Sequence, residues 1–463
     1  MTLLLQAAPL LVLLGLLLSG RAGPVTACLL GLALAVPAAM VSLPAGTGLP
    51  GFLLAEVLRG GFLALQPVAV VAGGLLFHAA VSQQASTAEQ PASAARTFAV
   101  ALPLGGFLES VTGFGVGAVF ALASLRAMGI KGPVAGALSL LALMLVPWGG
   151  LGPGTALGAA LAGLPGQDIA MVAAWPNAAW MVLVAPLIWS LTRRAGLVVS
   201  TTEKLAQLAI LLLLAAVLLL ANAFLPFEVA GILATGIALV WALWRAAPPT
   251  NWRQPLHAAA PYLLLTACLL LARLWHNPPA FQPFAEFPAF PLTHVATVLW
   301  VISVLLLLRG GQLAGAGRAA LARARKPALA MLLFVIFGRL MAGSGAAAAL
   351  ASALAGVMGP LAPYAIPLMA LASGIVTGSN VGSNATLTPF QVGLGQAAGL
   401  PPALAPGLHN FAGGAGAGMS FGVTAMICGL LADGTRPPQL WRLMAPSMAL
   451  VLLLGWAAVA LLR

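Results

Sequence analysis

Charge is the scarcest property of this 463-residue chain. Only 6% of the residues are charged and only eight are Asp or Glu, whereas 61% are hydrophobic. Soluble domains carry about a quarter of their residues as charged side chains, which form their outer surface. The composition therefore excludes a water-soluble fold and requires the lipid bilayer as the outer solvent.

Cysteine is nearly absent as well. The three cysteines, Cys28, Cys268 and Cys428, stand alone in apolar surroundings, with no CxxC pair and no histidine cluster. This pattern excludes a disulfide framework and gives no sign of a metal site or another cofactor.

Motifs for catalysis are also missing. The chain has no GxxxxGK phosphate loop, which excludes an ATPase of its own, and no HExxH zinc motif. No Ser, His and Asp occur at a spacing that by itself supports a catalytic triad. We therefore do not expect an enzyme.

The net charge of +12 does not indicate nucleic-acid binding, because the basic residues form no surface patch. They fall in short clusters between apolar runs, as in cytoplasmic loops that obey the positive-inside rule. The loop 276–291 carries Glu286 and no Lys or Arg, so we expect it outside. The clusters expected in the cytoplasm are Arg21; Arg126 with Lys131; Arg193, Arg194 and Lys204; Arg245 with Arg253; Arg309 through Lys326; and Arg436 with Arg442.

Long apolar runs predict an all-α polytopic membrane protein with about 12 transmembrane helices, since about 20 residues cross the hydrocarbon core. The first run lacks a preceding positive charge, and Arg21 follows it. This favours an uncleaved first span over a signal peptide. The runs lie near 3–19, 24–44, 61–81, 132–148, 171–190, 204–222, 226–244, 257–274, 293–308, 328–345, 419–432 and 443–462.

Two stretches, 97–125 and 361–394, are too long and too interrupted by glycine for one plain span. We interpret each as a re-entrant hairpin, the first open to the cytoplasm and the second to the outside. The hairpins, followed by helices broken near 147–154 and 413–418, predict two inverted-topology repeats, 1–200 and 201–463. The alternative for the breaks is a set of tight loops between short helices.

The first hairpin contains GGFLESVTGFGVGA (105–118). An intramembrane carboxylate such as Glu109 is costly unless it titrates or faces a polar cavity, so it is a candidate for proton coupling. The alternative is an interfacial side chain that reaches water. The following residues offer hydroxyls and close backbone approach at the expected tip, and are candidate substrate ligands: Ser110, Thr112, Gly113, Phe114 and Gly115.

The second hairpin contains SGIVTGSNVGSNATLTPFQ (373–391). Gly378 would break the helix, and Ser379 or Asn380 would cap the next half-helix, whose N-terminus then forms an anion site without lysine. The i,i+4 pairs Ser379–Ser383 and Asn380–Asn384 each lie along one helical face. The hydroxyl and amide groups on these faces suit the carboxylate and hydroxyl of a 2-hydroxy acid. The alternative is that they hold neighbouring helices together.

Three further residues are candidates. His409, at the second break, could carry a proton or be a satisfied hydrogen-bonding group, and Asn410 beside it is a candidate substrate ligand. Arg339, in the middle of an expected span, could pair with a substrate carboxylate, neutralise Glu109 or bond free carbonyls.

Three segments resemble the lactate permease family. Phe107–Gly115 stands where that family has FLEGAAGFG, Thr377–Asn384 resembles its TGSNTxSN segment, and His409–Gly414 resembles its AANxxGG run. The resemblance implies proton-coupled uptake of lactate, or glycolate in some members, across the bacterial inner membrane. It also implies an ion-transporter-like carrier whose hairpin domain moves past a scaffold that often dimerises.

We thus expect a multi-pass symporter of lactate or a related 2-hydroxy monocarboxylate, whose partners are a small organic anion, a proton and the bilayer. A sodium- or proton-coupled carrier of another organic anion, such as a dicarboxylate, tricarboxylate or sulfonate, is the alternative. An anion channel is the alternative from a different class, and it could not accumulate substrate against a gradient.

Overall fold

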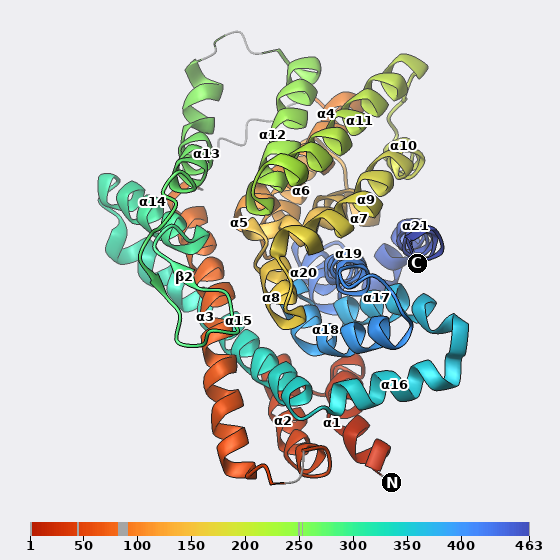
Figure 1. Ribbon diagram of the computed structural model, residues 1–463. Coiled ribbons are helices and arrows are strands. Elements are labelled where there is room, and N and C mark those ends of the chain that lie inside the picture. The colour runs from red at the N-terminus through yellow and green to blue at the C-terminus, as the bar shows by residue number, and fades with distance from the viewer. Residues whose placement is uncertain (1, 44–45, 82–90, 249–250, 252, 463) are drawn as a thin grey trace.

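The computed structural model describes residues 2–43, 46–81, 91–248, 251 and 253–462, most of which lie in helices (Figure 1). In this part of the chain, strands occur only as the short antiparallel pair β1 (Ala280–Phe281) and β2 (Phe290–Pro291). The predicted all-α class is confirmed.

Eight helices in the described part are long and apolar enough to cross a membrane, or ten if each of two bent pairs is one span. Four further apolar helices have 10–17 residues, among them α1 (Thr2–Leu18) and α2 (Pro24–Met40). The number of full-length spans is thus below the expected 12, because several predicted runs form short or broken helices.

The stretch predicted as the first hairpin folds back on itself. It comprises α4 (Ala94–Ala99), a π-helical turn (Val100–Leu104), α5 (Gly105–Thr112) and α6 (Val116–Ala127). The chain then forms α7 (Gly132–Leu140), a 3-10 segment (Leu141–Leu151) and α8 (Pro153–Ala162). The helix between α7 and α8 breaks at Gly149–Gly152, inside the interval 147–154.

The second hairpin consists of α17 (Ala365–Thr377) and α18 (Asn380–Ala397), followed by α19 (Leu404–Gly418) and α20 (Phe421–Leu431). The expected break at 413–418 is wrong, because α19 continues through these glycines and ends before Met419 and Ser420. The glycines serve close packing instead: a Cβ on Gly374 of α17 would lie 2.7 Å from the Ala417 nitrogen of α19.

The remaining helices surround these hairpins (Figure 1). A 3-10 turn, Gly359–Tyr364, leads into the second hairpin. The helices are α3 (Leu49–Val81), α9 (Gly166–Leu183), α10 (Ala185–Arg194), α11 (Thr201–Phe224), α12 (Phe227–Ala246), α13 (Arg253–Ala272), α14 (Val295–Arg309), α15 (Leu313–Gly343), α16 (Ala346–Met358) and α21 (Pro437–Leu462). The division into two inverted repeats remains a prediction.

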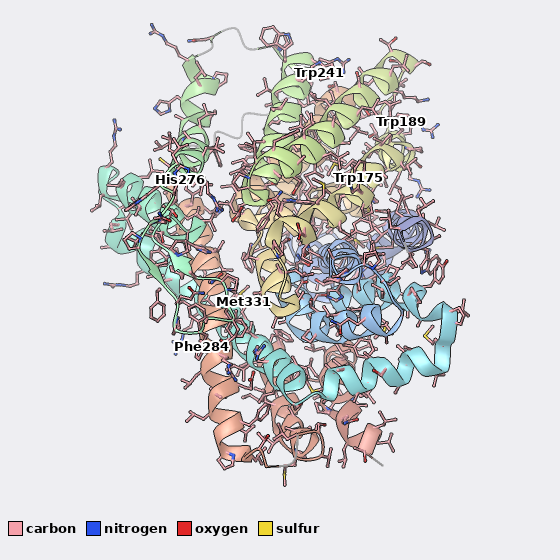
Figure 2. The ribbon with its side chains drawn as sticks, viewed as in Figure 1. Trp175, Trp189, Trp241, His276, Phe284 and Met331 are labelled. Atoms are coloured by element: carbon pink, nitrogen blue, oxygen red, sulfur yellow. The ribbon has the colours of Figure 1, made fainter. Side chains whose placement is uncertain are left out.

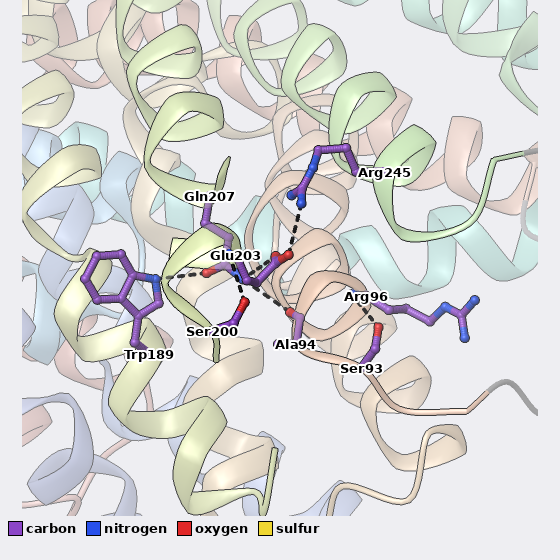
Figure 3. Close-up of polar contacts among 8 residues, drawn as sticks. All are labelled: Ser93, Ala94, Arg96, Trp189, Ser200, Glu203, Gln207 and Arg245. Carbon is purple, nitrogen blue, oxygen red and sulfur yellow. Dashed lines mark hydrogen bonds and ion pairs between the residues drawn. The ribbon is translucent and has the colours of Figure 1, made fainter. Parts of the chain in front are cut away.

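A polar cluster holds the start of the first hairpin against α10, α11 and α12 (Figure 3). Gln207 donates to the Ala94 carbonyl at 3.4 Å and to Glu203 at 2.8 Å, and it accepts from the Trp189 indole at 3.0 Å. Arg245 pairs with Glu203 at 3.0 Å. The base of this hairpin is therefore attached to three neighbouring helices.

The loop between α13 and α14 packs on α3. Its Phe281 and Phe284 lie against the ring of Phe62, with centroids 5.7 and 5.9 Å away, and its Glu286 accepts from Arg59 at 2.9 Å. Figure 2 labels two residues of this loop, His276 near its start and Phe284 in its middle. The loop expected outside the membrane is thus a packed part of the fold.

Candidate functional site

The two hairpin tips meet at a cavity of about 130 Å³. Its walls come from both tips, from the broken helix between α7 and α8, and from the junction of α19 with α20. The lining residues are Glu109, Gly113, Phe114, Gly115, Leu143, Val146, Gly149, Pro153, Gly154, Gly378, Ser379, Asn380, Val381, Ala417, Gly418 and Val423.

Among the described residues, Glu109 is the one ionisable side chain that lines this cavity. Its side chain is only 3% exposed, so it is not an interfacial group that reaches bulk water. One carboxylate oxygen accepts from the Gly115 amide and the other from the Gly117 amide, both at 3.1 Å. The carboxylate thus caps the N-terminus of α6, where the helix dipole stabilises a negative charge.

The first tip has an unusual backbone. Gly113, Phe114 and Gly115 have φ values of 69°, 58° and 78° in succession. The left-handed region costs an L-residue such as phenylalanine about 1–2 kcal/mol. A Cβ on Gly113 would lie 3.2 Å from the Gly150 Cα, so the tip and the broken helix approach each other through glycine backbone.

The second tip is built with hydroxyls. Gly378 has a φ of 71° and ends α17, and the Ser379 hydroxyl accepts from the Gly382 amide at 3.3 Å. Of the two predicted caps, Ser379 is therefore the one that caps α18. The Thr377 hydroxyl donates to the Ser373 carbonyl at 2.8 Å.

Four helices begin at the cavity: α6, α8, α18 and α20. Residues of their first turns or caps are among the lining, including Gly115, Gly154, Asn380 and Val423. Helix N-termini carry partial positive charge, so the four together favour a negative group at the cavity. The half-helices therefore converge on a wall in which the described residues include no lysine or arginine.

A network of buried amides lies behind the second tip. Asn410 accepts from Asn380 at 2.9 Å and from Asn384 at 3.2 Å, and it donates to the Thr155 hydroxyl at 2.8 Å. Thr155 in turn donates to the Pro147 carbonyl at 2.5 Å, a group freed by the helix break. The network therefore joins α18, α19 and α8 at the back of the cavity.

His409 lies in a second polar chain. Its Nε2 is 3.1 Å from the Ser383 hydroxyl, which donates to Ser373 at 3.2 Å. The side chain is fully buried, and its Nδ1 has no hydrogen-bond partner among the described residues. His409 is outside the cavity wall, so its role in proton coupling stays a prediction.

The structure brings only part of the predicted ligand set to the cavity. Ser110 and Thr112 donate to carbonyls of their own helix, Gly106 at 2.8 Å and Leu108 at 2.6 Å. Residues in the wall are Glu109, Gly113, Phe114, Gly115, Gly378, Ser379 and Asn380, whereas Ser110, Thr112, Arg339, Ser383, Asn384, His409 and Asn410 are outside it.

Arg339 does not neutralise Glu109. It pairs with Glu56 of α3 at 2.7 Å, and its guanidinium lies 4.9 Å from the centre of the Phe287 ring. Glu56 is only 2% exposed and also pairs with Arg59 at 2.9 Å. Glu56 lies before residue 61, where the span was expected to begin, so it was not among the predicted residues, although an acidic residue in an apolar segment was the available signal.

The solved structures that match nearly the whole chain include two transporters. Alcanivorax borkumensis YdaH, described as having an unusual topology, matches with a TM-score of 0.54, 17% identity, and coverage of 95% of this chain and 99% of that one. Neisseria gonorrhoeae MtrF, described as illuminating a class of antimetabolite efflux pumps, matches with a TM-score of 0.50, 12% identity and 94% coverage of both chains.

The chain has their fold. No protein-family model matches it, and no curated protein does. The likeness therefore establishes the fold of these two proteins over nearly the whole length and does not single out the lactate permease family.

Proposed function

We propose that the protein is a secondary carrier that moves a small organic anion together with a proton through the cavity between the hairpin tips. The observation that carries this proposal is the junction itself, where four half-helix N-termini meet one buried carboxylate. The N-termini attract the anion, and the carboxylate provides a group whose charge can change.

The coupling follows from electrostatics. An ionised Glu109 beside a bound carboxylate would place two like charges in one low-dielectric cavity, which is unfavourable. A proton on Glu109 removes this repulsion, so anion and proton occupy the site together more easily than either does alone. The loaded site is then nearly neutral, which lowers the cost of crossing a membrane that carries a potential.

The size of the cavity favours a small substrate. About 130 Å³ lies below the range of about 300–1,000 Å³ typical of drug-sized ligands. A 2-hydroxy monocarboxylate such as lactate matches this size and the hydroxyl and amide groups of Ser379 and Asn380. A dicarboxylate or tricarboxylate would bring more negative charge, and the described residues of the cavity wall include no cationic side chain to balance it.

Efflux is a second candidate, because MtrF, which has the same fold, is described as one of a class of antimetabolite efflux pumps. In that case the proton would move against the anion, and an outward substrate flux would follow an inward proton gradient.

The test is transport of labelled L-lactate in proteoliposomes with an imposed proton gradient and a no-gradient control. Accumulation along the inward gradient that a protonophore abolishes is the expected result. Accumulation driven by a sodium gradient alone would identify sodium as the coupling ion. Exit of lactate driven by an inward proton gradient would favour efflux. If lactate does not move, competition by glycolate, malate, citrate and small sulfonates identifies the substrate class.

A further inference from the structure

A second and larger cavity, of about 540 Å³, lies between the ends of α3, α13 and α14 and the turn that leads into α15. Its rim is polar and includes His257, Arg309 and Gln312. Its deeper wall is apolar and includes Pro261, Leu264 and Leu307. The cavity shares no lining residue with the one at the hairpin tips.

The rim belongs to a strongly basic part of the chain. Five cations occur between positions 309 and 326, and the sequence has no Asp or Glu from position 287 to 432. None of the five forms an ion pair within the part of the chain that the structure describes, whereas Arg245 of α12 and Arg273, just after α13, pair with Glu203 and Glu228. The five cations are Arg309, Arg318, Arg323, Arg325 and Lys326.

The helix beside the cavity is covered by little protein. In α13, Leu256, Leu263 and Leu264 are 57%, 58% and 47% exposed. Leu264 also lines the cavity, so the exposed apolar surface of this helix meets the cavity wall there. The cavity thus joins a cationic rim to an apolar surface that continues toward the middle of the bilayer.

The positive-inside rule places this basic segment at the cytoplasmic membrane surface, where anionic lipid is concentrated. Basic pockets between transmembrane helices on this side bind phospholipid headgroups. A soluble phosphate would use only the rim, whereas a phospholipid also covers the exposed leucines.

We propose that this cavity binds one anionic phospholipid of the phosphatidylglycerol type. Arg309 and His257 hold the phosphate and the glycerol headgroup, and the first part of the acyl chains lies on Leu264 and its neighbours. The bound lipid fills the space between α13 and α14, where α13 has few protein neighbours.

The test is a lipid titration of the purified full-length protein in detergent, with each lipid adduct counted by native mass spectrometry. Dioleoyl phosphatidylglycerol is compared with dioleoyl phosphatidylcholine and with glycerol 3-phosphate. We expect the first phosphatidylglycerol to bind more tightly than the phosphatidylcholine, and glycerol 3-phosphate not to displace it.

The variant Arg309→Gln should weaken phosphatidylglycerol binding about fivefold, since one cation near the surface contributes about 1 kcal/mol. His257→Ala should weaken it in the same direction. The matched control is Arg318→Gln, an exposed cation of the same segment that is outside the cavity wall and should leave the affinity unchanged. Melting temperatures of the variants check that each remains folded.

Three results would overturn the proposal. Equal affinity for the two lipids would mean that the headgroup charge is not recognised. Equal losses in Arg309→Gln and Arg318→Gln would mean that the whole basic segment attracts lipid without a defined site. Displacement by glycerol 3-phosphate would mean that the occupant is a soluble phosphate compound.

Discussion

The two hairpins share one construction but differ in their chemistry. In both, a half-helix ends at a positive-φ glycine and a second half-helix begins at the cavity. The first tip is capped by the Glu109 carboxylate, and the second by the Ser379 hydroxyl. The first tip therefore holds a charge that protonation can remove, whereas the second offers fixed, neutral dipoles.

The same contrast extends to the other ends of the hairpins. At the first hairpin, Arg126 donates to the Leu430 carbonyl at 2.6 Å, and Asp433 accepts from the Gly132 amide at 3.1 Å. At the second, the Trp456 indole donates to the Tyr364 carbonyl at 2.9 Å. From position 340 to 432 the sequence contains no Asp, Glu, Lys or Arg. On the proposed coupling, we expect the first hairpin to respond to protons and the second to form a constant surface.

The sharpest test of this contrast is to neutralise each tip. Glu109→Gln should reduce proton-driven accumulation at least about tenfold, because it removes the titratable group of the cavity, a change equivalent to about 1.4 kcal/mol or more. Ser379→Ala should weaken the cap of α18 by about 1 kcal/mol while the response to the proton gradient persists. Uptake with and without the gradient measures both effects.

Substrate exchange without any gradient is the control, since Glu109→Gln should still allow it if only coupling is lost. The assignment of coupling to the first tip fails if this variant still accumulates substrate in response to a pH gradient.

Substitution of the two tip glycines should affect the hairpins unequally. Gly113 has φ 69° and ψ −168°, a combination open essentially to glycine alone, and it lies against Gly150. Gly113→Ala should therefore abolish uptake and lower the melting temperature strongly. Gly378 has φ 71° and ψ 13°, so Gly378→Ala should cost about 1–2 kcal/mol, and Gly378→Asn less.

Melting temperature and uptake of the three variants in parallel decide this prediction. Similar tolerance at both positions would show that the first tip is no more constrained than the second.

The third prediction concerns the uncharged amide network behind the second tip. Asn410→Ala removes a hub with three side-chain hydrogen bonds, leaving buried groups unpaired at about 1–3 kcal/mol each. Asn177→Ala is the matched control, because that equally buried amide donates only to the Ala173 carbonyl of its own helix. We expect a clearly lower melting temperature for the first variant, and equal values would mean that the network does not stabilise the second hairpin.

The local chemistry of both tips could be predicted from the sequence. Both stretches are too long for one span and are interrupted by glycine inside an otherwise apolar run, so 97–125 and 361–394 were recognisable as hairpins. The glycines at 413–418 were misread because glycine serves two purposes, breaking a helix or allowing two helices to approach closely. The close packing of α17 against α19 shows that these glycines allow close approach, and this packing cannot be seen in the sequence.

Contacts between distant segments could not be predicted in the same way. Arg339 and Glu56 are 283 positions apart in the chain, and nothing in either local pattern identifies the other as its partner. The same holds for Thr155, whose hydroxyl joins the amide network across 255 positions. Such pairs depend on how the helices pack against one another. Neither the hydrophobic periodicity of a helix nor its turn residues determine that packing.

The smallest expected effect concerns the surface contact at the base of the first hairpin. The Thr435 hydroxyl and amide hold the pKa of Asp433 below its ordinary value of 3.8, and the Gly132 amide acts in the same direction. A lowered pKa in the folded state means that the contact is complete above pH 4 and is lost as the pH falls through the folded-state pKa. Because Asp433 is exposed, its stabilising effect is small.

Asp433→Asn should therefore cause a modest loss of hydrogen-exchange protection in the turn around Gly132 at neutral pH, after correction for the intrinsic exchange rate. The wild-type turn should lose the same protection only below about pH 4, near the usual aspartate pKa. The turn at Gly399, which follows the second hairpin and has no acidic neighbour in the sequence, should be unaffected by either change. Equal responses of the two turns would mean that protonation acts on the whole protein. The surface ends of the two hairpins would then not differ in their sensitivity to protons.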